Sequence, residues 1–533
     1  MMPHHIVLAA STGLLAHNAI FIRGEWHMRI PHIVAGHCLL GSFAWYSISQ
    51  SNGDGSLREA SQAFAVMVMA YLTALFGSMT VYRLFFHRCT KFPGPKLAAV
   101  TKLWHIWHIR KSTNFSFLKE LHEKYGNIIR TGPNEITLVD PAAYQLLDGW
   151  GTSTTRDVWY DVLRPRYSAV FSRDEDVHRK GPMNAFHPRI VKLAQSLSSC
   201  IKAHGTSAVD VDEVMSWFSF DVMGDIVFGK DFNLLESRVW TPAIEHRDRA
   251  LALVGPIGDT IWIARLAFWL VPFYGRVKDW FRMVSFCEDQ IKERLERGKD
   301  KGRVDMSEYF LDEYQMHSRE KTLQDRNLYL GGTITTAVVA GSDTSRAALI
   351  ASCWYLAKYP EHASKIRDET RNVDLNDTTT LASLPHLNGF INETLRLVPP
   401  IMTGTSRITG PDGLMLDDVL IPPYTRVTTP RYAIMRMESA FPQPDDFIPE
   451  RWYSRPELIR DKRAFAPFSV GGRQCVGRTV AYTEVRCVTA LLLRDYDIEF
   501  APGYDPMTMW RDMKDQVTAQ PGQVRCLFKP RGV

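Results

Sequence analysis

The sequence lacks the cysteine spacing of most metal and disulfide frameworks. Its eight cysteines, spread over 533 residues, include no CxxC pair. Paired zinc ligands, redox dithiols and disulfide-rich secreted modules usually show closely and regularly spaced cysteines, so these classes are disfavoured. The cysteine usage therefore favours a reducing compartment.

Nucleotide-binding signatures are missing as well. No GxGxxG or GxxxxGK[ST] string stands between a strand and a helix, which disfavours an internal nicotinamide, flavin or nucleotide site. If the protein performs redox chemistry, its electrons must come from a separate protein.

The sequence has only a small excess of positive over negative charge. The formal net charge is +5, and lysine and arginine are scattered rather than clustered, which argues against nucleic acid as the main partner. The composition is 45% hydrophobic and 11% aromatic, enough for a large core. We expect one large globular domain with an accessory segment.

The accessory segment lies at the N-terminus. Residues 63–82 carry no charge and are about long enough to cross a ~30 Å hydrocarbon core. Two weaker apolar stretches, residues 6–22 and 31–48, contain polar residues such as His17 and His37. We expect three membrane spans; the alternatives are one span, with the weaker stretches as packed helices, and, less favoured, a cleaved signal peptide.

Basic residues follow the strong span and place the rest of the chain in the cytosol by the positive-inside rule. They are Arg83, His87, Arg88, Lys91, Lys96 and Lys102. A Phe-Pro-Gly-Pro segment at 92–95 then ends the helix. The expected organisation is a membrane anchor over residues 1–90 and a globular domain over residues 91–533.

The globular domain is expected to be mainly α with small β-sheets. Helical periodicity is present at residues 115–125, 211–228, 280–297, 328–358, 384–397 and 477–493. Short strand-like pieces occur at 128–131, 136–139 and 427–430, without the regular alternation of a parallel-sheet fold.

The most specific motif is FSVGGRQCVG at residues 468–477. A thiolate must reach a metal from a tight loop, and glycines allow the backbone to approach closely. Cys475 also precedes a predicted helix, whose N-terminal N–H groups would favour thiolate over thiol. A buried structural cysteine is the alternative.

This string matches FxxGxRxCxG at every defined position and resembles the haem-binding loop of the cytochrome P450 family. The resemblance implies a haem b cofactor with Cys475 as axial ligand of the iron. It also implies that Phe468 and Gly477 shape the loop and that Arg473 reaches a haem propionate.

A second motif is Glu393 with Arg396, an ExxR whose side chains share one helix face. By resemblance, Arg451 in the Pro-Glu-Arg-Trp string at 449–452 joins them. The implied role is structural: a buried ionic cluster that holds the haem loop in place. An exposed helical ion pair is the alternative.

A third motif, AGSDTS at 340–345, lies inside a long apolar helix and resembles the family's oxygen-activation motif. The resemblance assigns Gly341 to leaving room over the iron, Thr344 to a hydrogen bond toward bound dioxygen, and Asp343 to proton relay. A helix cap or an exposed turn is the alternative.

Two basic segments could serve the haem propionates. Arg407 matches the family's propionate-binding position, with a solvated surface arginine as the alternative. The segment His178-Arg179-Lys180 departs from the family pattern because it stands too close to Phe186 and precedes Gly181 and Pro182. A helix there, and its propionate contact, are in doubt.

The chain looks most like fungal microsomal members with several N-terminal spans that act on alkaloids or terpenoids in secondary metabolism. The resemblance implies a monooxygenase that inserts one oxygen atom from O2 into a small hydrophobic substrate. NADPH-cytochrome P450 reductase would supply electrons at the endoplasmic reticulum membrane. Expected pocket residues are 158–167, 257–268, 340, 342, 401–403 and 517.

Two other functions stay open at this stage. A haem-thiolate isomerase or dehydratase would rearrange a peroxide without consuming O2, and the Asp343-Thr344 pair speaks against it. A haem-binding sensor or membrane scaffold would need neither proton relay nor substrate channel.

Overall fold

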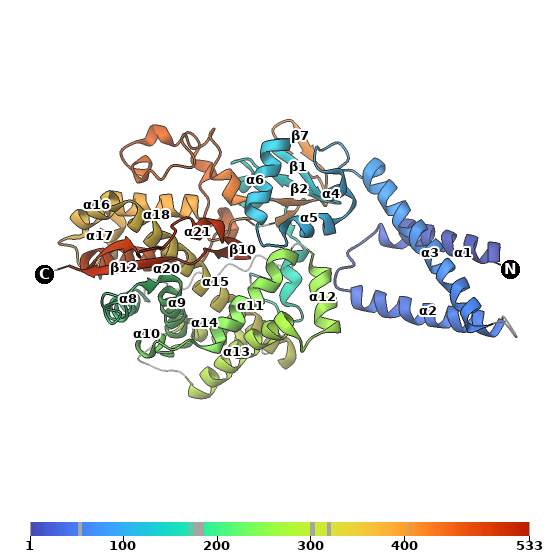
Figure 1. Cartoon of the computed structure of the whole chain (residues 1–533), viewed down its shortest axis with the longest axis horizontal. Helices are drawn as coiled ribbons and strands as arrows, with labels where there is room; N and C mark the ends of the chain where they lie inside the picture. The colour runs from blue at the N-terminus through green and yellow to red at the C-terminus, as the bar shows by residue number, and fades with distance from the viewer. Residues whose placement is uncertain are drawn as a thin grey trace.

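The structure is a computed structural model that describes residues 2–51, 56–168, 170, 171, 173, 186–258, 260–298, 304–316, 321–404 and 406–531. The His178-Arg179-Lys180 segment lies outside the described residues. Figure 1 shows a large, mainly helical body from which the first three helices project.

The projecting part is a bundle of three N-terminal helices. α1 (Met2–Leu15) continues into the π-helical η1 (Ala16–Phe21), α2 (Ile30–Ser51) returns, and α3 (Leu57–Val81) continues into η2 (Tyr82–Phe86). Among the described residues, Leu57–Phe86 is the one helical segment that is long and apolar enough to span a membrane. It contains the strong span expected at 63–82.

The two weaker stretches are helical and pack against α3. Gly13 lies against the backbone of Tyr71, and the indole nitrogen of Trp45 donates to Ser61 Oγ at 3.1 Å. Further along the chain His17 Nδ1 lies 2.8 Å from Ser78 Oγ, whereas His37 Nε2 lies 2.9 Å from the Tyr71 hydroxyl. α1 therefore runs parallel to α3, and α2 runs antiparallel to it.

The large body contains eighteen helices in the described residues. They are α4 (Lys96–Val100), α5 (Lys102–Ile109), α6 (Asn114–Tyr125), α7 (Ala143–Asp148), α8 (His187–Lys202), α9 (Val211–Phe228), α10 (Leu234–Ser237), α11 (Pro242–Ile257), α12 (Ile261–Leu270), α13 (Gly275–Arg297), α14 (Met306–Met316), α15 (Leu323–Lys358), α16 (Pro360–Thr370), α17 (Thr378–Ser383), α18 (Pro385–Leu397), α19 (Arg431–Ile434), α20 (Arg478–Asp495) and α21 (Thr508–Arg511). Short 3-10 turns are η3 (Val158–Leu163), η6 (Pro449–Trp452), η7 (Pro456–Leu458), η8 (Lys462–Ala464) and η9 (Gly471–Arg473).

The 36-residue helix α15 is the centre of the body. Its N-terminus is capped by the Thr322 side chain, which accepts from the backbone N–H of Asp325. Most of its residues are apolar or small and buried on all sides, as expected of a helix enclosed by others. α9, α13, α18 and α20 pack around it and form the largest hydrophobic cluster.

The β-structure is small. One sheet has the order β1 (Ile128–Gly132), β2 (Glu135–Leu138), β8 (Arg426–Thr428), β5 (Ser406–Ile408) and β3 (Thr155–Arg156), with only β2 and β8 parallel. β4 (Val209–Asp210), β12 (Arg525–Pro530) and β9 (Tyr496–Phe500) form a second sheet, and β6 (Leu414–Leu416) with β7 (Val419–Ile421) and β10 (Lys514–Gln516) with β11 (Thr518–Gln520) form hairpins.

The mainly α fold with small sheets agrees with the expectation from the sequence. All six expected helices are present, with ends shifted by up to five residues, as for the helix expected at 280–297, which begins at Gly275. The three expected strand pieces are β1, β2 and β8.

Candidate functional site

The cysteine loop is fixed at both ends. The backbone N–H of Cys475 donates to the carbonyl of Phe468 at 2.8 Å, and the Phe468 ring packs on Tyr482 of α20 with centroids 5.1 Å apart. Gly471 has φ +62°, and a Cβ there would collide with the carbonyl of Asp148. Gly477 then forms the N-cap of α20.

Cys475 differs from the other cysteines of the large body. Six of the eight cysteines are buried, and Cys38 lies on α2, so Cys475 is the accessible one within residues 91–533. Its thiol is nevertheless surrounded by protein, and this burial raises the pKa of Cys475. A Cys475 side chain that is accessible and yet surrounded by protein is expected if it faces a space inside the molecule.

The electrostatics around the thiol correct one expectation. The Gly477 N–H and the charges of Arg431 and Arg478 lower the pKa of Cys475, as the helix N-terminus suggested, but burial outweighs them and the pKa stays above its ordinary value. The protein alone therefore favours the thiol. A coordinated metal cation deprotonates such a thiol outright, so this environment fits a thiolate-ligated iron.

The three residues of the expected ionic cluster lie together in the core. Arg396 Nη2 and Nε donate to the two carboxylate oxygens of Glu393 at 2.8 and 2.9 Å, and Arg451 Nε donates to Oε1 at 2.9 Å. All three side chains are at most 1% exposed. This burial excludes the alternative of an exposed helical ion pair.

The cluster is hydrogen-bonded on every side. The Trp452 indole and the Ile448 N–H also donate to Glu393, at 2.9 and 3.0 Å. Arg396 and Arg451 use their other N–H groups on the carbonyls of Met435, Pro442, Gln443, Pro444, Asp446 and Leu458. Burial alone would raise the pKa of Glu393, but the two arginines hold it below its ordinary value. A fully satisfied buried network of this kind imposes a single geometry on the segments before the cysteine loop.

Thr344 lies in the middle of α15, which excludes a helix cap or an exposed turn. Its hydroxyl donates to the carbonyl of Ala340, one turn earlier, at 2.6 Å. Ala340 is exposed, whereas Val338, Ser342 and Asp343 beside it are buried, so the Ala340 side of α15 is accessible. That placement agrees with the pocket position expected for Ala340.

Two neighbouring expectations are wrong. Gly341 does not open space on the Thr344 side, because a Cβ there would collide with the sulfur of Met223 on α9; it permits close packing of α15 and α9. Ser342 does not line a pocket either. It is fully buried, donates to the Val338 carbonyl at 2.7 Å and accepts from Arg247 Nη1 at 3.2 Å.

Asp343 is fully buried in a charged network. Gln520 Nε2 donates to Oδ2 at 2.7 Å, and the Thr518 hydroxyl donates to the same oxygen. Arg247 and Arg346 lie 3.7 and 3.4 Å from Oδ1. The network reaches partly exposed surface at Asp248, which accepts from Arg247 at 2.6 Å.

Arg407 and Arg473 meet at a carboxylate that the sequence did not single out. Arg407 is 2% exposed, which excludes a solvated surface arginine, and its Nε donates to Asp148 Oδ1 at 2.7 Å. Arg473 lies 3.8 Å from the same oxygen and donates to Thr154. Ser469 donates to Asp148 Oδ2 at 2.8 Å, so Asp148 ties α7 to the cysteine loop.

Several of the expected pocket residues converge in one apolar cluster. Val162 and Leu163 of η3, Ile261 and Phe268 of α12 and Val517 after β10 pack in it. Val339 of α15, which the sequence did not single out, joins them. A cluster of aliphatic and aromatic side chains beside Ala340 suits a hydrophobic substrate.

The donor set fits a haem-thiolate centre: an accessible cysteine at a helix start, a small residue and a threonine on a buried helix, and two basic side chains beside the loop. Fold and site together define the class of haem-thiolate oxidoreductases. The sequence model of the Cytochrome P450 family matches residues 93–527. The chain belongs to this family, which confirms the resemblance seen in the sequence.

Curated relatives cover nearly the whole chain. Tryprostatin B 6-hydroxylase of Aspergillus fumigatus is 29% identical over 96% of this chain and 94% of its own. Cytochrome P450 monooxygenase sthD of Phaeosphaeria nodorum is 31% identical over 87% and 99%, and cytochrome P450 monooxygenase lcsK of Purpureocillium lilacinum is 29% identical over 100% and 99%. The protein is thus a haem-binding monooxygenase that needs a redox partner, O2 and a hydrophobic substrate.

Proposed function

We propose that Cys475 is the axial ligand of the haem iron in this monooxygenase. The observation that carries the proposal is its position: it is the accessible cysteine of the large body, in a loop fixed by Phe468, Gly471 and Gly477. A haem held by the Cys475 thiolate would supply the chemistry for activation of O2 and insertion of one oxygen atom, and the residues of the chain would hold it and position the substrate.

The other residues of the site hold, orient and supply protons. Thr344 presents a hydroxyl on the accessible side of α15. The preceding residue, Asp343, lies in a charged network that reaches Asp248 through Arg247. Arg407 and Arg473 would hold the haem propionates, with Asp148 keeping both guanidinium groups in place.

Glu393, Arg396 and Arg451 have a structural role in this proposal. They fix the backbone segments that lead into the cysteine loop. The organisation we infer is a membrane anchor over residues 1–90 and a haem-thiolate domain over residues 91–533.

We infer that the three N-terminal helices all enter the endoplasmic reticulum membrane, with the catalytic domain in the cytosol. α1 and α2 pack along the apolar α3 and keep large apolar side chains exposed, such as Leu39, Leu40 and Phe43. The exposed Trp269 and Leu270 lie at the end of α12, which contacts α2, and the exposed Phe273 follows shortly after that helix. Such contiguous apolar surface suits a lipid phase. NADPH-cytochrome P450 reductase is the redox partner in this arrangement.

For the substrate we propose a bulky hydrophobic alkaloid or terpenoid of fungal secondary metabolism. The support is the apolar cluster beside Ala340 and the similarity to a protein named as a tryprostatin B hydroxylase.

The test is an untargeted metabolite comparison between host cells that express the chain with a reductase and cells that express the Cys475→Ala variant. A product heavier by one oxygen atom, dependent on NADPH and labelled by 18O2, is expected only with the wild type. A product formed without O2 would instead indicate an isomerase or dehydratase, and no turnover of any metabolite would favour a sensor or scaffold.

A further inference from the structure

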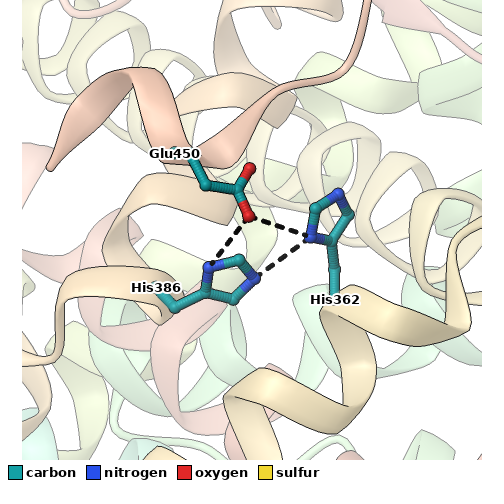
Figure 2. A group of neighbouring side chains, drawn as sticks. All are labelled: His362, His386 and Glu450. Atoms are coloured by element: carbon teal, nitrogen blue, oxygen red, sulfur yellow. Dashed lines mark hydrogen bonds and ion pairs between the residues drawn. The ribbon is translucent and has the colours of Figure 1, made fainter. Parts of the chain in front are cut away.

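Two histidines and a glutamate from three different elements converge away from the cysteine loop. His362 lies on α16, His386 in the first turn of α18 and Glu450 on η6 (Figure 2). His362 Nδ1 is 3.2 Å from His386 Nε2 and 3.9 Å from Glu450 Oε1. One ligand atom from each residue can be chosen so that all three lie within 4.8 Å of one another.

We propose that His362, His386 and Glu450 bind one divalent transition-metal ion, with Zn²⁺ as the best match. Two imidazoles and one carboxylate form a common three-ligand zinc set, with a fourth position open to water. Ligand atoms of a tetrahedral zinc site lie about 3.3 Å apart, as metal–ligand bonds of about 2.0–2.1 Å require. Two of the observed separations are 3.2 and 3.9 Å, and all three ligand atoms lie within 4.8 Å of one another. Glu450 Oε1 is also 3.9 Å from His386 Nδ1, so the carboxylate must shift toward His386 Nε2 when an ion binds.

The second contact of His386 orients it for this role. Its Nδ1 lies 2.9 Å from the hydroxyl of Tyr453, which leaves Nε2 directed at His362. Outer-shell hydrogen bonds of this type fix the ring and tautomer of metal-bound histidines. His362 and His386 are 7% and 2% exposed, so the rings are held by packing.

The protonation states also suit a metal. Burial lowers the pKa of His386 to about 4 and that of His362 below its ordinary value, so both imidazoles are neutral near pH 7. Burial would raise the pKa of Glu450, but its contacts with Lys365 and the backbone hold it below its ordinary value. Neutral imidazole and ionised carboxylate are the ligating forms.

The ammonium group of Lys365 competes with a metal ion for Glu450. Lys365 Nζ lies 2.6 Å from Glu450 Oε1 and would have to move when the metal binds. The Lys365 side chain is 51% exposed, so it can turn to solvent. Zinc binding should therefore strengthen when this ammonium is removed.

A bound ion would join α16, α18 and η6. α18 carries Glu393 and Arg396, and η6 carries Arg451, so the ion would clamp the same two segments that form the buried ionic cluster. A metal that binds the folded state raises its stability by mass action. The site would thus stabilise the scaffold of the cysteine loop without taking part in oxygen chemistry.

The test uses the full-length, haem-loaded protein in detergent, treated with EDTA and dialysed. Zinc is added at rising concentrations, metal content is measured by mass spectrometry, and thermal unfolding is followed alongside the haem spectrum. We expect one zinc per chain and a saturable rise in the unfolding temperature that EDTA reverses. The variants His362→Ala and Glu450→Gln should weaken zinc binding by about tenfold or more.

Lys365→Met is the discriminating variant, because it removes the competing ammonium without removing a ligand. It should bind zinc more tightly than the wild type. His122→Ala changes a histidine on α6 whose Nδ1 lies 3.2 Å from the carbonyl of Gly126 and that is no part of this cluster, so it should not change zinc binding. Absence of zinc from the wild type, or equal zinc-dependent shifts in wild type, His362→Ala and Glu450→Gln, would overturn the proposal. Haem ligation by Cys475 is read separately from the spectrum, so failure there leaves this outcome interpretable.

Discussion

His27 Nε2 lies 2.8 Å from Asp161 Oδ2, so the loop between the first two N-terminal helices is bound to the catalytic domain. Glu25 in the same loop is held by Arg173, with Oε1 and Nη2 2.8 Å apart. Burial alone would raise the pKa of Asp161, but His27, Arg173 and Arg164 together keep it below its ordinary value. Asp161 belongs to η3, whose Val162 and Leu163 lie in the apolar cluster. The N-terminal anchor therefore contacts and stabilises η3, which contributes side chains to the proposed substrate region.

Deleting residues 1–88 should release the protein from microsomal membranes and leave haem incorporation largely intact, because the packed core begins after the Pro/Gly segment. The truncated protein should unfold at a lower temperature, since Asp161 and Arg173 lose Glu25 and His27. Fractionation, a haem spectrum and a melting curve measure these effects. The full-length Glu25→Gln variant should reproduce only a small part of the destabilisation, about 1 kcal/mol or less for a half-exposed pair. Loss of haem from the truncated protein would show that the anchor is part of the catalytic fold.

Cys475→Ser should abolish the thiolate signature of the reduced, carbon monoxide-bound protein, because an alkoxide is a poor substitute for a polarizable sulfur ligand. Cys487→Ser is the matched control, since Cys487 is buried on α20 and should leave the Soret position unchanged. A wild-type Soret position in Cys475→Ser would exclude this residue as the ligand.

Thr344→Ala should leave haem content nearly unchanged, lower the product formed per NADPH and raise hydrogen peroxide. The hydroxyl holds a proton at the accessible face of α15, and protons delivered out of order release peroxide instead of product. Thr335→Ala removes an equivalent hydroxyl-to-carbonyl bond, to Gly331 at 2.8 Å, from a buried position of the same helix and should not alter the ratio. An unaltered product ratio in Thr344→Ala would contradict this role.

Asp343→Asn should slow turnover, within the 10²–10⁴-fold range typical of acid–base groups, more than it uncouples. The amide keeps the hydrogen-bonding shape toward Gln520 but loses the charge that faces Arg247 and Arg346. Turnover per haem is compared with the melting temperature, because loss of these ion pairs also destabilises the fold. Turnover that falls only in proportion to folded protein would assign Asp343 a purely structural part.

Glu393→Gln should prevent accumulation of haem-loaded protein. Removing one partner of a buried ion pair typically costs about 3–5 kcal/mol, and here two arginines would lose their counter-charge. Glu361→Gln, an exposed position on α16, is the control and should be neutral. Haem-normalised yield from parallel expressions measures the effect; equal yields would show that the cluster is dispensable.

Glu484→Gln should change how stability depends on pH. Glu484 is buried on α20, and burial raises its pKa from 4.5 to about 7, which outweighs the lowering effect of the nearby Ser345. The unfolded chain ionises this group near pH 4.5, so its contribution to stability is complete below that pH and is lost as pH rises to about 7. The loss is roughly 3 kcal/mol for a shift of this size. The variant should therefore melt higher than the wild type at pH 8 but not at pH 4.5; parallel melting curves at both pH values decide.

The sequence by itself determined the local structure and the main motif. The helical spacing of the apolar residues and the capping residues predicted the ends of α9 and α15 to within a few residues. Local backbone geometry follows from this pattern of side chains. The pair Glu393 and Arg396 was predictable for the same reason, since residues three apart share a helix face. The cysteine loop was recognisable because its glycines and Cys475 stand in one short segment.

Tertiary packing alone decided the contacts between distant segments. Asp148 meets Arg407 across 259 positions, and Thr518 and Gln520 meet Asp343 across 175 and 177. Gly341 faces Met223 rather than the Thr344 side of α15, and this depends on how α15 and α9 cross. His362, His386 and Glu450 converge because three separate elements meet at one place. A sequence pattern with a period of a few residues carries information about a helix face, but which face meets which neighbour is set by the packing of the whole core.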